Sequence, residues 1–211
     1  MRAWHFCCVD AHHRPVLRDG TMALGPGAVE EYDWPLVMCW SGLHASPRAI
    51  DALAYAPGAW VRRVDCGGDI VAIGDKLVCT RRTIVAHADA SDVLSSWARW
   101  CALQVADLWC CPVIVREWLV TGDPALRADA LTVISSGSPW PPYAVLAAMD
   151  ASATMYLSME RTLSARQAVI GAAWTAARDA RAAAPSAATE MDEAQNAELE
   201  RRLEALLAAA D

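Results

Sequence analysis

The sequence predicts an α+β fold: a small, mainly antiparallel β-rich N-terminal unit with one short helix, followed by an all-α C-terminal half. Short apolar runs separated by turn residues dominate residues 1–90, which is typical of strands. Alanine then becomes abundant, with 17 of the 43 alanines in residues 1–120 and 26 in residues 121–211. We expect three regions: a β-rich unit (1–90), a helical region packed on it (91–184) and an acidic C-terminal helix (185–211).

In the N-terminal region, the first strand is expected at residues 3–9. Ser46-Pro47 predicts a helix start, because serine caps helices and proline suits their first position, and this helix should run to about Tyr55. A strand at 59–66 should end in a turn at Gly67-Gly68. Further strands are expected at 69–73, 77–80 and 83–86.

In the C-terminal region, Ser91 should begin a helix that runs to about residue 109. Its apolar spacing places Trp97, Trp100 and Cys101 inward and Arg99 outward. Asp123-Pro124 predicts another helix start. The remaining helical segments are expected at 112–120, at 143–184 and from Ser186 or Thr189 to about 209.

Composition narrows the classes of function. The 211 residues carry a net charge of −7, which disfavours non-specific binding of nucleic acid or of an anionic membrane surface. The apolar run at residues 4–9 is too short for a signal peptide, so the eight cysteines should stay reduced. The longest apolar stretch, 101–115, is interrupted by Gln104 and Asp107. We therefore expect a cytoplasmic protein that does not span a membrane.

One block of motifs resembles an uncharacterised protein family of bacteriophages and prophages. The residues that carry the resemblance are Cys39, Gly42-Leu43-His44-Ala45-Ser46, Asp51-Ala52-Leu53, Tyr55-Ala56-Pro57-Gly58, Asp75-Lys76-Leu77-Val78, Arg82 and Ile84. The start of the chain (Trp4-His5-Phe6) and residues 121–127 are also similar to members of that family. The resemblance implies a phage or prophage origin and supplies no catalytic residues.

A second resemblance concerns part of the ADP-ribosyltransferase core. Residues 42–46, followed by a helix with Ala52 and Tyr55 and then a strand, are similar to its Gly-x-Tyr-x-Ser/Thr strand and Ala-x-x-Tyr helix. The resemblance implies an NAD site formed by His44, Ser46 and Tyr55. The chain departs from this pattern in two ways. The His-Gly-Ser/Thr strand is missing, with His5 the nearest strand histidine, and no glutamate lies between Glu31 and Glu117, so Asp65, Asp69 or Asp75 would have to substitute.

Other candidate sites each have a plain structural interpretation. Cys7-Cys8 with His12-His13 lacks the spacing of a metal site, so we expect no metal. A Cys39–His44 nucleophile pair lacks an orienting third group. Asp75-Lys76 indicates either an anion contact or a hairpin whose charges face water. Trp140-Pro141-Pro142-Tyr143 indicates either a recognition turn, with Trp140 and Tyr143 as binding residues, or a packed corner between helices.

These observations favour a phage-encoded, non-enzymatic protein that binds another protein, for example a host or anti-phage defence component. Because residues 91–211 carry 9 basic and 15 acidic side chains, a partner with a basic surface fits best. No cofactor, direct nucleic-acid contact or membrane contact is expected. The alternatives are an ADP-ribosyltransferase-like enzyme that uses NAD and a phage structural or assembly protein.

Overall fold

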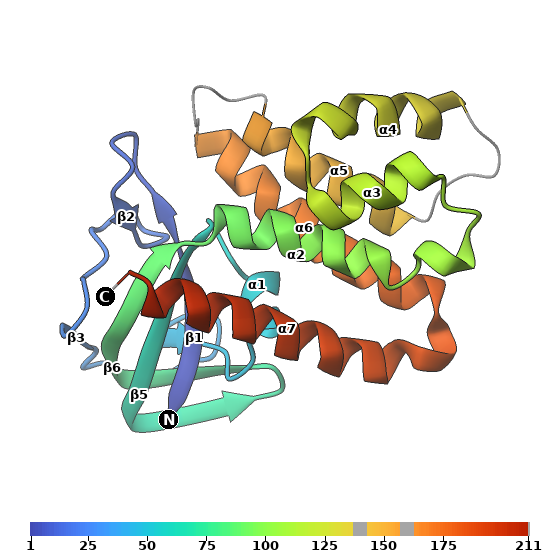
Figure 1. The fold of residues 1–211 in the computed structure, drawn as a ribbon. Coiled ribbons are helices and arrows are strands. Elements are labelled where there is room, and N and C mark those ends of the chain that lie inside the picture. Colours follow the sequence, from blue (N-terminus) through green and yellow to red (C-terminus); the bar gives the residue numbers. More distant parts are fainter. Residues whose placement is uncertain (137–142, 157–162, 211) are drawn as a thin grey trace. The chain divides into compact units, whose positions relative to one another are not determined.

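The computed structural model describes residues 1–136, 143–156 and 163–210 (Figure 1). The strands are β1 (Arg2–Val9), β2 (Pro15–Val16), β3 (Val29–Glu31), β4 (Leu43–Ala45), β5 (Trp60–Ile73) and β6 (Lys76–Asp89). The helices are α1 (Ala49–Ala54), α2 (Ser91–Leu103), α3 (Val113–Thr121), α4 (Pro124–Ser136), α5 (Tyr143–Tyr156), α6 (Leu163–Ala183) and α7 (Ala188–Ala208), with short 3₁₀ helices at Ala106–Leu108 and Pro185–Ala187. The predicted α+β class is confirmed.

The chain forms two compact units. The first contains residues 1–90 and 199–211, and the second contains residues 91–198. Helix α7 therefore contributes its last residues to the first unit and its earlier ones to the second.

The first unit is built around an antiparallel sheet that curves into a half-barrel. Its strand order is β2-β1-β5-β6-β3, and β4 also pairs with β6. The long β5–β6 hairpin forms the centre, with β1 on one side and β3 and β4 on the other. One part of the interior is an apolar cluster that includes Ala3, Val64, Leu77 and Ile84. The polar residues described below occupy another part.

The turn predicted at Gly67-Gly68 is wrong, because both residues lie inside β5. The strand pairing shifts register between Gly67 and Ile70, which marks a bulge, and Gly68 has a φ of +69°. A side chain at Gly68 would collide with Thr80, whose Oγ1 accepts a hydrogen bond from the Asp69 N–H at 2.9 Å. The reversal instead occurs at Gly74, so β5 and β6 are continuous strands rather than several short ones.

Ser46 does not cap the first helix, contrary to the sequence-based expectation. Its backbone N–H and carbonyl pair with Trp4 of β1, at 3.0 and 2.8 Å. Helix α1 begins three residues later, at Ala49, whose N–H donates to Glu200 Oε1 at 3.1 Å. A carboxylate from the far end of the chain thus satisfies a helix N-terminus that has no local cap.

The last ten residues of α7 pack against the rest of the first unit through one face of the helix. Leu199, Leu203 and Leu207 recur at four-residue spacing and are buried. Glu200 also accepts a hydrogen bond from Trp4 Nε1 at 3.2 Å, and Glu204 pairs with Arg63 Nε at 3.1 Å. This packing role could not be expected from the sequence, because the periodicity of an amphipathic helix does not say which partner its apolar face covers.

In the second unit, α2 contacts α5 and α6, and α3 contacts α4. Trp97 and Cys101 of α2 are fully buried as predicted, whereas Trp100 and Arg99 are both half-buried. The helix ends at Leu103, earlier than expected, and a 3₁₀ turn follows at Ala106–Leu108. The start predicted at Asp123-Pro124 is confirmed, with the Ala125 N–H donating to Asp123 Oδ1 at 2.8 Å.

All eight cysteines are free thiols. Within the described ranges, no helix combines the length and apolar character needed to cross a membrane. The same part of the chain contains no group of three or more His, Cys, Asp or Glu side chains that could hold a metal ion.

Replacing Trp97 by alanine should destabilise the second unit by about 3–5 kcal/mol, as is typical for a buried large aromatic side chain. The substitution also removes the hydrogen bond that the indole Nε1 donates to the carbonyl of Gln195 at 3.1 Å. Thermal unfolding followed by circular dichroism measures the change. Val113→Ala, at a position that is 81% exposed, is the control. An unaltered melting curve for Trp97→Ala would contradict the assigned helix face.

Candidate functional site

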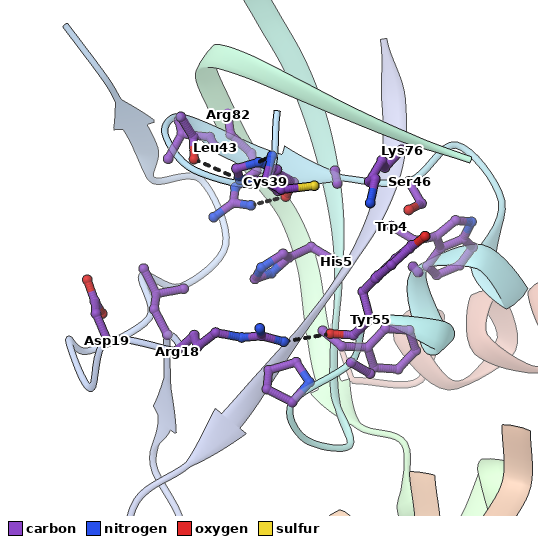
Figure 2. A pocket seen from close by; sticks show the side chains of 18 of the residues that line it. Trp4, His5, Arg18, Asp19, Cys39, Leu43, Ser46, Tyr55, Lys76 and Arg82 are labelled. Atoms are coloured by element: carbon purple, nitrogen blue, oxygen red, sulfur yellow. Dashed lines mark hydrogen bonds between the residues drawn. The ribbon is translucent and has the colours of Figure 1, made fainter. Parts of the chain in front are cut away.

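A pocket of about 550 Å³ opens into the half-barrel of the first unit. Figure 2 shows His5 of β1 at its centre, with Arg18 and Tyr55 below and Arg82, Cys39 and Lys76 above in that view. Segments far apart in sequence therefore supply the walls. His44, Ser46, Tyr55 and Lys76, which were singled out from the sequence, all line this pocket.

A buried ion triad lies behind one wall. Glu30 of β3 pairs with Arg62 of β5 through Oε1 at 2.7 Å and with Arg82 of β6 through Oε2 at 2.7 Å. The side chains of Arg62, Glu30 and Arg82 are only 0%, 9% and 3% exposed. Two guanidinium groups share one carboxylate, so the triad carries an excess positive charge. Arg82, which also donates to the carbonyl of His44, brings this charge to the pocket wall.

His5, Arg62 and His87 occupy directly opposed positions on β1, β5 and β6. Burial lowers the pKa of His5 well below 6.5, and the nearby Arg82 and Arg62 lower it further. Burial, followed by Arg62, also lowers the pKa of His87. His5 Nδ1 lies 3.5 Å from Cys7 Sγ. Both imidazoles are therefore neutral near pH 7, and the cationic character of the site comes from its arginines and its lysine.

The ring of His44 is fully engaged by the backbone. Its Nε2 accepts a hydrogen bond from the Cys39 N–H at 2.9 Å, and its Nδ1 lies 3.1 Å from the carbonyl of Gly42. Burial lowers the pKa of His44 and favours this neutral form. Cys39 adopts a φ of +68°, which is uncommon for a residue other than glycine. His44 therefore holds a strained turn in place, and neither of its ring nitrogens is free to activate Cys39 as a nucleophile.

Asp75 and Lys76 meet Tyr55 at the pocket rim. The Tyr55 hydroxyl donates to Asp75 Oδ2 at 2.7 Å, and this bond raises the tyrosine pKa. Lys76 Nζ lies 4.3 Å from the centre of the Tyr55 ring, which is a cation–π distance. The predicted hairpin turn is present, with Asp75 hydrogen-bonded to Tyr55 and Lys76 lining the pocket, whereas the anion contact stays a prediction.

Of the remaining sequence candidates, Trp140 lies outside the described residues. Tyr143, at the start of α5, is 76% exposed and does not line the pocket. His12 and His13 are exposed, whereas Cys7 is buried.

Three residues of the site carried no usable signal in the sequence. Glu30 and Arg18 look like ordinary surface charges there, and Trp40 is one of ten tryptophans. Strand pairing and loop folding bring them to the site. No pattern of spacing along the chain records that arrangement.

Comparison with known protein families gives a match over part of the chain. Residues 19–96 match a family model described as a domain of unknown function, DUF7666. The matched segment contains Glu30, His44, Tyr55, Lys76 and Arg82, whereas His5 and Arg18 precede it. No curated protein and no solved structure matches the chain. Most of the pocket therefore lies in the part of the chain that is similar to this family.

Glu30→Gln should destabilise the first unit by about 3–5 kcal/mol, because it leaves two buried guanidinium groups without a counter-charge. Glu31→Gln, at the exposed neighbouring position on β3, is the matched control and should change the free energy of unfolding by less than about 0.5 kcal/mol. Urea denaturation measures both. Equal midpoints for the two variants would show that the triad contributes no stability.

Stability should also fall as the pH decreases from 7 to 5. Histidines whose pKa is lowered in the folded chain take up protons more readily when the chain is unfolded, so protons favour the unfolded state in this range. For His5, the slope should approach at most about 1.4 kcal/mol per pH unit. Urea denaturation across this range should show a shallower dependence for His5→Gln than for the exposed control His12→Gln. Parallel curves for the two variants would contradict the assignment.

Proposed function

We propose that the half-barrel binds a small anionic molecule and does so without catalysing a reaction on it. The observation that carries the proposal is the charge of the pocket. Arg18, Lys76 and Arg82 line it, and Asp19 is the one carboxylate among the described lining residues. Behind the wall, the single negative charge of Glu30 is paired with two guanidinium groups, so this triad has a net positive charge.

The size and construction of the pocket support a small-molecule ligand. Its volume of about 550 Å³ falls within the roughly 300–1,000 Å³ usual for such sites. Apolar groups such as Phe6, Leu17 and Pro57 form other parts of the lining. A largely apolar cavity with a few placed cations strengthens each charge interaction by excluding water.

The candidate catalytic groups already have hydrogen-bond or ion-pair partners within the protein, which favours binding over catalysis. His44 uses both ring nitrogens on the backbone, and Glu30 is held between two arginines. A transferase using NAD would need a carboxylate facing the substrate, and among the described lining residues only Asp19 could supply one. NAD remains a useful probe, because His44, Ser46 and Tyr55 border one cavity.

Protein binding is a second candidate function, supported by exposed aromatic side chains. Trp34 and Trp40 are 73% and 87% exposed in a loop that also presents Val37. Exposed tryptophans are frequent at binding hot spots. We propose a host or defence protein with a basic surface as the partner, in the cytoplasm of a cell that carries the phage or prophage. The origin and compartment in this proposal follow from the sequence resemblance and the composition.

Anions should raise the melting temperature of the full chain. The probes are inorganic phosphate, pyrophosphate, citrate and NAD, each tested separately by thermal unfolding. A probe at 100 times its dissociation constant should add about 2.7 kcal/mol of stability.

The double variant Arg18→Gln/Lys76→Gln should weaken binding at least tenfold, because it removes two pocket cations. Arg14→Gln/Arg81→Gln removes the same charge from exposed positions outside the lining and should bind normally. Failure of all four probes to shift the melting temperature would reject the anion pocket. Equal weakening of binding by both double variants would also reject it, because the effect would then come from the overall charge of the protein.

A further inference from the structure

The mouth of the pocket differs chemically from its cationic walls. Trp40 lines the mouth with 87% of its surface exposed, and Tyr55, also in the lining, is 44% exposed. Burying the indole in the chain would normally be favourable, so its exposure leaves a large, planar apolar surface beside the cations. A ligand that covers this surface must carry a flat ring as well as a negative charge.

The loop that carries Trp40 is held in a defined conformation. The Trp40 N–H donates to the carbonyl of Val37 at 2.9 Å, and Ser41 Oγ donates to the carbonyl of Pro35 at 2.7 Å. The neighbouring Cys39 is fixed by His44 through its N–H. The ring is thus presented from an ordered backbone, which reduces the entropy lost when a ligand stacks on it.

Two cations and a neutral imidazole come from separate elements. Arg18 follows β2 and donates to the carbonyl of Tyr55 at 3.1 Å, Lys76 begins β6, and the neutral ring of His5 lies on β1 between them (Figure 2). Groups that approach from several directions suit the several oxygens of a phosphate better than a single planar carboxylate. The contact of Lys76 with the Tyr55 ring also places a positive charge directly beside the aromatic mouth.

We infer that the ligand of this pocket is a phosphate ester of an aromatic compound, such as a nucleoside monophosphate. Its ring stacks on Trp40 at the mouth, and its phosphate lies among Arg18, Lys76 and His5. This inference rests on the proposed anion-binding function and adds the class of ligand. The ring of His44 fixes the turn at Cys39 that precedes Trp40.

The test is isothermal titration of the full chain with AMP, GMP, CMP and UMP, each compared with ribose 5-phosphate. At least one nucleotide should bind about tenfold or more tightly than ribose 5-phosphate, which has the phosphate but no ring. Trp40→Ala should remove that advantage and leave the affinity for ribose 5-phosphate unchanged. Trp34→Ala removes an exposed indole of the same loop that does not line the pocket, so it should retain the advantage.

The outcomes separate the two proposals. Equal affinities for the nucleotides and ribose 5-phosphate, or a nucleotide advantage that survives Trp40→Ala, would overturn the aromatic ligand while leaving an anion pocket. If neither the nucleotides nor ribose 5-phosphate nor the simple anions bind, the proposed function fails as well. Because Trp40 is so exposed, Trp40→Ala should fold normally, and its melting temperature without ligand confirms this.

Discussion

The shared carboxylate of Glu30 is the interaction on which the half-barrel and its pocket both depend. It joins β3 to β5 and β6 by pairing with Arg62 and Arg82 inside the sheet. A buried ion pair gains stability only when its geometry offsets the loss of hydration, and here both carboxylate oxygens are used. The same arrangement leaves one guanidinium charge uncompensated, so the structural core of the unit also contributes positive charge at the pocket wall.

The positive charge of the triad helps to keep the nearby histidine His5 neutral. His5 stands beside two arginines in a buried position, and each of these conditions disfavours a proton on its ring. His44 is neutral for a related reason, since its nitrogens serve the backbone of the Cys39 turn. The imidazoles therefore shape the pocket, while Arg18, Lys76 and Arg82 provide its charge. This division of roles is one basis of the proposed binding function.

The mouth and the walls of the pocket are connected through His44. Its carbonyl accepts a hydrogen bond from Arg82 of the triad, and its ring holds the loop that presents Trp40. Residues 42–46, which are central to both resemblances noted in the sequence, thus connect the buried charges to the exposed aromatic surface. Residues 19–96, which match the family of unknown function, contain Glu30, Trp40, His44 and Arg82 together.

The sequence by itself determined the α+β class, the first strand, the change to helices after residue 90 and the start of α4, because local periodicity and capping residues specify these features. It also selected His44, Ser46, Tyr55 and Lys76, which the fold brings to one cavity. Only the tertiary structure decided the bulge at Gly67-Gly68, the cap that Glu200 supplies to α1 and the meeting of Glu30 with two arginines. These features depend on strand register and on contacts between residues up to 151 positions apart. Local sequence preferences specify neither of them.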